Sequence, residues 1–443
     1  MSAIGNRIAP RHALTLALLV ALSTPTPAQS VDPATLEQLR QELQALKAEQ
    51  AERDRAIRRI EEALDRLQGD VAPHGELEPE PAPAQAATTA AAAPTLASAT
   101  ADTAPRLKIS GDARVRAQGD WSDDDGKNRL SMQFRGRLGA TWAATDRLTV
   151  GARLATGDAD DPNSVDVQLS NWLDDLDISL DQAYLRYDIG HAELYAGKMP
   201  QPFKRTELVW DGDVNPQGLA IRHGLPLAGG GTLRSNALYF VVDESAGGPD
   251  SEMLGLQLGY DSPRGGDWRF DAALAYYHYD LGSLAGADAG DFRSNLRGAD
   301  GRYLSDFHLA NALLGVDYHG FGERWPLRLV ADYVKNLGAW NDADSGYGVD
   351  LILGKAARPG DWRFTYGYAM TQADAVLAAF SQDSIGIGTN YRLHALTADF
   401  VPWPKTTLSA VWYHYRPYEA AWAGANAPRD WLDRLRLSLM VSF

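Results

Sequence analysis

The chain has 443 residues, a formal net charge of -16 and no cysteine. The negative charge argues against a nucleic-acid partner, because phosphate backbones are bound by basic surfaces. The lack of cysteine excludes thiol catalysis, disulfides and thiolate metal sites. No run of 18 apolar residues exists, which excludes helical membrane spans. A membrane barrel stays compatible with the mean hydropathy of -0.31, because alternating strands halve the apparent hydropathy.

The N-terminus has the pattern of an export signal. Arg7 and Arg11 precede the apolar run "ALTLALLVAL" at 13–22, and the small-residue segment "STPTPAQS" follows. Ten apolar residues are too few to anchor a chain in a bilayer. We therefore expect residues 1–28 to be a signal peptide that is cleaved after Ala28. The alternative is an amphipathic N-terminal helix.

Residues 34–71 predict an α-helical coiled coil that drives oligomerisation. Apolar residues recur seven apart at the two core positions of a heptad. These residues are Leu36, Leu39, Leu43, Leu46, Ile57, Ile60, Leu64 and Leu67. An isolated helix cannot bury this narrow apolar stripe, so we expect several helices to associate. The alternative is a single helix that lies along the main body of the protein. Residues 72–105 are rich in Pro, Ala and Thr and predict a linker.

From residue 106 to 443 the apolar pattern has a period of two, which predicts β-strands. In "LRLSLMVSF" at 435–443, for example, Leu435, Leu437, Leu439 and Val441 alternate with mostly polar residues. Sixteen such segments are predicted. They span 106–119, 129–143, 147–157, 178–189, 191–197, 217–223, 232–242, 252–261, 267–279, 308–318, 325–335, 346–356, 361–371, 387–400, 405–416 and 431–443.

The connections between these segments alternate between short turns and long acidic loops, which is typical of a membrane barrel and not of a soluble β-sandwich. The phrase "GDWRF" occurs at 266–270 and at 360–364, and each copy puts a Trp at the start of a strand. Such a repeated Trp suits the aromatic girdle of a membrane interface. We expect an antiparallel transmembrane barrel of about sixteen strands at 106–443, which is wide enough for a water-filled channel.

One stretch resembles a known family. The sequence "KMPQPFKRTELVWDGDVNPQGL" at 198–219, together with "DQAYLRYD" at 181–188 and "ATGD" at 155–158, resembles the putative-porin family of Gram-negative outer membranes. The resemblance implies a porin in the cell outer membrane, in contact with its lipid. It also implies a homotrimer that lets small hydrophilic solutes diffuse, without catalytic residues.

The segment 198–216 interrupts the alternation and contains Pro200, Pro202 and Pro216, which central strands exclude. If it folds into the lumen, its charges of both signs form a pore constriction. The candidates are Lys198, Lys204, Arg205, Glu207, Asp211 and Asp213. The alternative is a turn in which Asp and Asn bond their own backbone. A calcium loop on Asp211, Asp213 and Asn215 lacks the later Gly and Glu, so no metal site or cofactor is expected.

Strand parity predicts an inward face rich in arginine. The pore-lining candidates are Arg114, Arg116, Arg135, Arg137, Arg153, Arg186, Arg434 and Arg436. The same parity rule assigns Arg234, Arg269, Arg328, Arg363 and Arg392 to this face. Two interpretations stay open. The arginines pair with carboxylates of neighbouring strands and stiffen the barrel, or they give the pore a weak preference for anions.

Three other classes of function are weaker. A hydrolase would need a nucleophile beside a positioned His, and His278 and His308 border a long loop without a G-x-S-x-G frame, so we expect no enzyme. An energy-coupled transporter would need about 22 strands and a plug. The main alternative is a structural protein whose coiled coil binds the cell wall (peptidoglycan) and tethers the outer membrane to it.

Overall fold

The computed structural model describes residues 106–122, 128–158, 161–169, 177–245, 248–282, 294–422 and 431–443. The expected signal peptide, coiled coil and linker lie outside these residues. Among the described residues, no helix has the length and apolar character needed to cross a membrane. The described part of the chain contains two single-turn 3-10 helices, η1 at Ala378–Phe380 and η2 at Ala420–Trp422.

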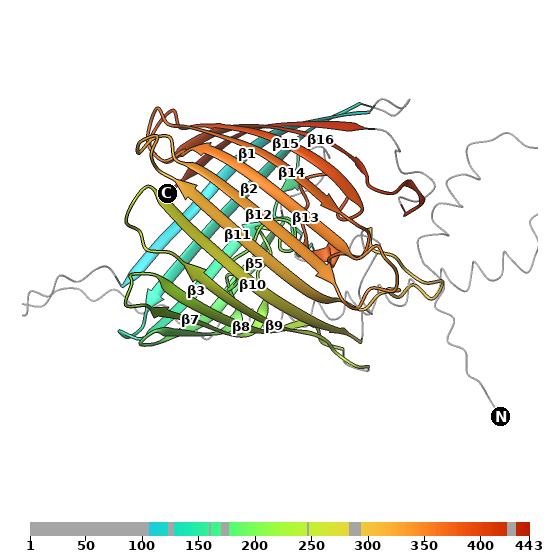
Figure 1. Cartoon of the computed structure of the whole chain (residues 1–443), viewed down its shortest axis with the longest axis horizontal. Helices are drawn as coiled ribbons and strands as arrows, with labels where there is room; N and C mark the ends of the chain where they lie inside the picture. Colours follow the sequence, from blue (N-terminus) through green and yellow to red (C-terminus); the bar gives the residue numbers. More distant parts are fainter. Residues whose placement is uncertain are drawn as a thin grey trace, which may run out of the picture. The chain divides into compact units, whose positions relative to one another are not determined.

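The strands form one closed antiparallel sheet (Figure 1). Each long strand pairs with its neighbours along the chain, and β17 returns to pair with β1. The strands are β1 (Leu107–Ser122), β2 (Arg129–Ala143), β3 (Leu148–Thr156), β4 (Val167–Gln168), β5 (Ile178–Ile189), β6 (Ala192–Lys198), β7 (Gln217–Pro226), β8 (Thr232–Asp243), β9 (Ser251–Asp261), β10 (Trp268–Leu281), β11 (His308–Tyr318), β12 (Leu327–Asn336), β13 (Ser345–Gly354), β14 (Trp362–Thr371), β15 (Tyr391–Phe400), β16 (Thr406–Pro417) and β17 (Leu432–Ser442).

All sixteen predicted segments correspond to strands of this barrel, and the prediction of a sixteen-stranded antiparallel barrel is confirmed. The two-residue strand β4 was not predicted. It lies within the long connection after β3 and pairs with β2, next to the residues of β2 that pair with β3. β4 therefore occupies the same place beside β2 as β3 does, and it does not add a full strand to the barrel.

The two faces of the sheet differ in polarity, as the period of two requires. On β17, Leu437, Leu439 and Val441 are exposed on the outer face, whereas Arg436 is buried on the inner face. On β1, Val115 is exposed and Arg116 is buried in the same way. Apolar side chains thus cover the outside of the barrel, and polar side chains line the inside.

Aromatic residues gather at the end of the barrel that carries the short turns. Trp268 and Trp362, from the two "GDWRF" copies, open β10 and β14 and are exposed. Their ring centroids lie 4.7 Å from Tyr318 and 4.6 Å from Phe400, respectively. Such a band matches the aromatic girdle that was predicted.

One strand has the opposite parity to the prediction. On β15, Tyr391 and Leu393 are buried on the inner face, so Arg392 lies on the outer face, over the ring of Tyr418 at 4.8 Å. The assignment of Arg392 to the inner face was therefore wrong. The reason is that this strand begins at Tyr391, after Asn390 at φ 56°, and its inward apolar pair packs on a loop inside the barrel.

Candidate pore constriction

The loop 199–216 between β6 and β7 lies inside the barrel. Met199 and Trp210 are fully buried, and Phe203, Leu208 and Val209 nearly so. Three prolines keep this segment out of the sheet, because proline cannot donate to a strand ladder. Its apolar side chains then need another surface, and the inner wall of the barrel supplies one.

The first half of the loop is anchored to strands far along the sheet. The backbone of Lys204 exchanges two hydrogen bonds with the side chain of Gln257 on β9, at 2.8 and 2.7 Å. The Lys204 ammonium pairs with Asp271 on β10. The Thr206 hydroxyl donates to Asp332 on β12. Because the loop leaves the sheet at β6 and reaches β12, it crosses the lumen.

Trp210 is the centre of an aromatic cluster inside the barrel. Its ring stacks on Phe380 at 5.8 Å and meets Tyr277 edge-on at 5.6 Å. Phe380 belongs to a second loop, 372–390, and its carbonyl accepts a hydrogen bond from the backbone N–H of Asp211 at 2.8 Å. The two loops therefore pack on each other in the lumen.

The inward fold of loop 372–390 was missed from the sequence, although the apolar run "AVLAAF" at 375–380 is a signal for it. The side chain of Asn295 holds this loop. Its amide donates to the carbonyls of Ala373 at 2.8 Å and Val376 at 2.9 Å, and its oxygen accepts from Ala378 N–H at 2.7 Å. A single buried amide thus satisfies three backbone groups of the loop.

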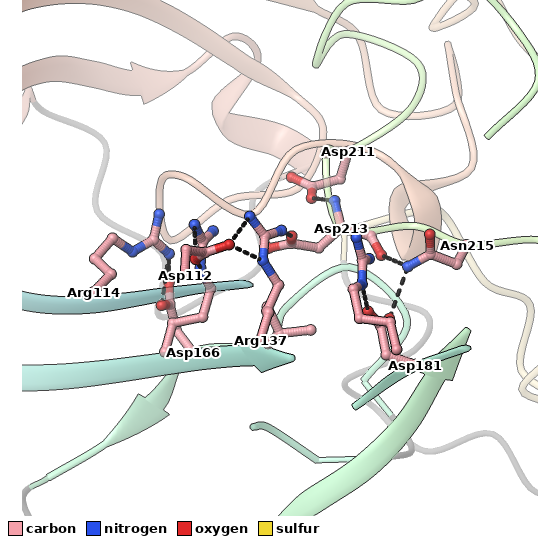
Figure 2. Close-up of polar contacts among 12 residues, drawn as sticks. Asp112, Arg114, Arg137, Asp166, Asp181, Asp211, Asp213 and Asn215 are labelled. Carbon is pink, nitrogen blue, oxygen red and sulfur yellow. Dashed lines mark hydrogen bonds and ion pairs between the residues drawn. The ribbon is translucent and has the colours of Figure 1, made fainter. Parts of the chain in front are cut away.

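The second half of the first loop, 211–216, is polar and folds as a turn. Asp213 N–H donates to Asp211 Oδ1 at 2.8 Å, and Asn215 Nδ2 donates to the Asp213 carbonyl at 2.8 Å. These bonds are those of the predicted alternative, a turn closed on its own backbone. The same residues also face the wall, because Asp213 pairs with Arg137 at 3.1 Å and Asn215 donates to Asp181 at 2.7 Å (Figure 2).

The wall opposite this turn is an arginine wall on β1, β2 and β17. Its members are Arg114, Arg116, Arg135, Arg137, Arg434 and Arg436. Each has an acceptor. The shortest contacts are Arg114–Asp166 2.6 Å, Arg116–Asp166 2.6 Å, Arg135–Asp112 2.9 Å, Arg137–Asp112 2.8 Å, Arg434–Asp120 2.5 Å and Arg436–Gln118 2.8 Å. Pairing across the wall is therefore extensive, as one of the two sequence interpretations expects.

Asp166 was not among the predicted residues. It lies just before β4 in the long connection that follows β3, and it turns inward to meet Arg114 and Arg116 (Figure 2). Burial alone would raise the pKa of this carboxyl, but Arg116 and Arg114 outweigh burial and hold the pKa below its ordinary value. Asp166 therefore stays ionised and offsets part of the arginine charge.

Asp211 has the opposite character. Its side chain is buried, and burial, with the neighbouring Glu207 and Asp383, raises its pKa above the ordinary value. Glu207 itself is more exposed, accepts from Gly212 N–H at 3.0 Å and lies 3.5 Å from Arg205. Arg205 also donates to the carbonyl of Trp210 at 3.0 Å.

The structure brings together some of the predicted residues and separates others. Arg137 and Asp213 meet, and Asp211 lies next to Asp213. Lys204 lies apart from them, against β9 and β10. Arg153 pairs with Asp181, and Arg186 with Asp188 at 3.2 Å, on β3 and β5. Lys198 is half-buried at the end of β6 and lines a cavity.

The barrel is similar in fold to solved outer-membrane proteins. The chain is similar to OprB of Pseudomonas putida in its high-pH structure, with 12% identity over 76% of this chain and 94% of that chain, and a TM-score of 0.52. OmpT of Vibrio cholerae, in a trimer form, has 11% identity over 76% of this chain and 99% of that chain, with a TM-score of 0.47. At these identities the likeness concerns the fold alone.

A family model described as "Putative porin" matches residues 122–286, which include the loop 199–216. The resemblance to that family, drawn from the sequence at 198–219, is thereby confirmed. No curated protein matches the chain.

Proposed function

We propose that the protein is an outer-membrane porin, a water-filled channel for the passive diffusion of small hydrophilic solutes. The observation that carries this proposal is the closed barrel with an apolar outside and a polar inside, narrowed by loop 199–216. The fold likeness to OprB and the family match over residues 122–286 support it.

The constriction of this channel lies beside the loop 199–216, whose turn at 211–216 contacts the arginine wall through the pair of Asp213 and Arg137. Solutes that pass there experience a field between arginines on one side and Glu207, Asp211 and Asp213 on the other. The six arginines of the wall face four paired carboxylates, Asp112, Asp120, Asp166 and Asp213. The excess of positive charge gives a weak preference for anions at high salt, and the acidic outer loops reduce it at low salt.

Purified protein in a planar lipid bilayer tests both statements. We expect ohmic conductance in KCl, and a reversal potential in a salt gradient that favours chloride slightly. A protein that inserts and folds but carries no current would contradict the porin proposal. A strong preference for cations at high salt would contradict the anion preference alone.

The signal peptide directs export of the chain, and the native assembly in outer-membrane lipid is a homotrimer. The coiled coil at 34–71 is a further contact between its three chains. A peptide of residues 29–72 should then form a helical oligomer, and a monomeric, unfolded peptide at high concentration would count against the coiled coil. Deleting residues 30–105 distinguishes the tethering alternative from the porin function. If the coiled coil tethers the membrane to peptidoglycan, the deletion should impair the integrity of the cell envelope and leave solute flux unchanged.

A further inference from the structure

A cavity of about 350 Å³ lies inside the barrel beside the loop 199–216. Its apolar lining includes Phe240 on β8 and Leu377 and Phe380 on the second inner loop. Its polar lining includes Lys198, Gln217 and Asp243. A concave site with an apolar wall and a few placed polar groups is the usual form of a small-molecule site, and this volume is within the usual range of roughly 300–1,000 Å³.

The charges around this cavity are not equivalent. Asp181 is paired with Arg153, and Asp213 is paired with Arg137, so both are neutralised. Asp158 and Asp161 also line the cavity and have interactions of their own.

Lys198 and Asp243 differ from these carboxylates. Within the part of the chain that the structure describes, neither side chain has an ion pair or a hydrogen bond. The cavity thus offers one free cation and one free anion.

The positions of these two residues fix their spacing. Lys198 ends β6 and Asp243 ends β8, and β7 lies between these strands. Neighbouring strands are spaced by about 4.8 Å, and Asp243 lies two residues beyond Val241, the position of β8 that is level with Lys198. With a rise of about 3.3 Å per residue, the two Cα atoms lie roughly 12 Å apart. Both side chains reach the same cavity, and a small molecule with a charge of each sign can lie between their tips.

We propose that this cavity binds a small zwitterion with an apolar body, such as an α-amino acid with an aliphatic or aromatic side chain. The carboxylate of the solute meets the Lys198 ammonium, its own ammonium meets the Asp243 carboxylate, and its apolar body lies against Phe240, Leu377 and Phe380. Charge-assisted hydrogen bonds of this kind are stronger than neutral ones. The inference rests on the proposed porin function and names its solute class.

Other solute classes fit less well. An inorganic anion would leave Asp243 without a partner. A simple cation would leave Lys198 without a partner, and a neutral sugar would leave both charges unpaired. Only a zwitterion satisfies both free groups at once, and the apolar wall selects one with an apolar body.

The test measures how solutes block the KCl current of the full-length protein in a planar bilayer. Leucine, 4-methylpentanoate and 3-methylbutylamine share an alkyl body, and the last two each lack one of the charges. Glycine has both charges but no apolar body. We expect saturable block by leucine at a lower concentration than by the other three, by about tenfold, which corresponds to about 1.4 kcal/mol.

Variants separate the two charges. K198Q should abolish the advantage of leucine over 3-methylbutylamine, and D243N should abolish its advantage over 4-methylpentanoate. The controls K355Q and D267N make the same chemical changes outside the cavity, near the short turns, and should leave the block by leucine unchanged.

The outcomes distinguish this inference from the proposed function. A normal KCl current that leucine does not block, or that all four solutes block equally, overturns the inference and leaves the porin proposal standing. Block by leucine that survives both K198Q and D243N also overturns it. A folded protein without any KCl current overturns the porin proposal itself.

Discussion

The two halves of the loop 199–216 contact the barrel in different ways. Residues 199–210 are anchored mainly by burial, with Met199 and Trp210 fully out of water and Phe203 against Tyr277 at 5.1 Å. Residues 211–216 are held by a short turn and by Asp213 and Asn215, which face charged residues of β2 and β5. One half is fixed by apolar packing, and the other presents charge.

This division separates stability from selectivity. Burial of a large aromatic side chain contributes a few kcal/mol to stability and is not weakened by the screening of charges by salt. A partly exposed ion pair contributes little to stability and depends on salt, but its charges still act on passing ions. Substitutions in the first half should therefore move the loop, whereas substitutions in the second half should alter which ions pass.

The largest effect is expected from W210A. Removing a fully buried aromatic side chain typically lowers the free energy of unfolding by about 3–5 kcal/mol. Trp210 stacks on Phe380, so the substitution should also release the contact between the two inner loops. Single-channel conductance should rise and the thermal unfolding temperature should fall. W268A removes an exposed Trp from the outer face and is the matched control. Unchanged conductance in W210A would refute the anchoring role.

N295A should have the next largest effect. It leaves the Val376 carbonyl and the Ala378 N–H without a partner, whereas the Ala373 carbonyl keeps its bond from the Thr389 hydroxyl at 2.8 Å. Each buried unsatisfied group lowers the free energy of unfolding by about 1–3 kcal/mol. We expect limited proteolysis to cut within 372–390, which the parent protein should resist. N128A, at an exposed position, should remain resistant. Equal resistance of both variants would show that the loop holds without this amide.

The raised pKa of Asp211 predicts a dependence of stability on pH. Above the ordinary value of 3.8 the unfolded chain loses the proton that the folded chain keeps. The free energy of unfolding is therefore not reduced by Asp211 below that pH. As the pH rises, it falls by up to about 1.4 kcal/mol per pH unit. D211N removes this titration, so its urea midpoint should vary less between pH 4 and pH 8.

For this titration D267N is the control, since Asp267 is exposed on a short turn. It should keep the pH dependence of the parent protein. The contrary outcome is that the urea midpoint of the parent protein rises across this interval and that of D211N rises by the same amount. Asp211 would then ionise normally in the folded state.

A smaller effect, on selectivity, is expected from D213N. Asp213 neutralises Arg137 in part, so its loss leaves more positive charge at the constriction. The reversal potential in a KCl gradient should shift toward anions, with little change in the unfolding temperature. E323Q, at an exposed position on a short turn, should not shift it. A reversal potential that does not shift in D213N would place Asp213 outside the ion path.

The smallest effect is expected from the double substitution K204Q/R205Q, which should shift the reversal potential toward cations. Both side chains already have carboxylate partners, Asp271 and Glu207, which reduces their action on the pore. K355Q/R358Q makes the same charge change outside the lumen. If the double variant at 204 and 205 behaves like this control, these two residues belong to the anchored half of the loop alone.

The strands were predictable from the sequence because a membrane barrel has one solvent on each face. Most lipid-facing positions then need an apolar residue, and the period of two survives in most of the long strands. The inner loops lack such a rule. The run at 375–380 is apolar because it packs on Trp210, and no local pattern identifies a partner that is more than 150 residues away.

The site residues were predictable only as candidates. Parity assigned the six arginines of the wall to the inner face, but it could not identify their partners, which include Asp166 from a long connection. Parity failed at Arg392 because Tyr391 and Leu393 are apolar on the inner face, where they pack on a loop. Where the lumen is filled by protein, the inner face also becomes apolar, and alternation no longer tells inside from outside.

The seam between β1 and β17 has a consequence for how the barrel is assembled. Its register runs from Asp112↔Ser442 to Ser122↔Leu432, and the bond between Arg434 and Asp120 joins residues 314 positions apart. Until β17 is in place, β1 presents a free edge whose N–H and C=O groups can pair with any other strand. Contacts so distant in sequence form slowly. The cell must therefore shield that edge during insertion, and the step that closes the seam is where we expect misassembled and aggregated chains to arise.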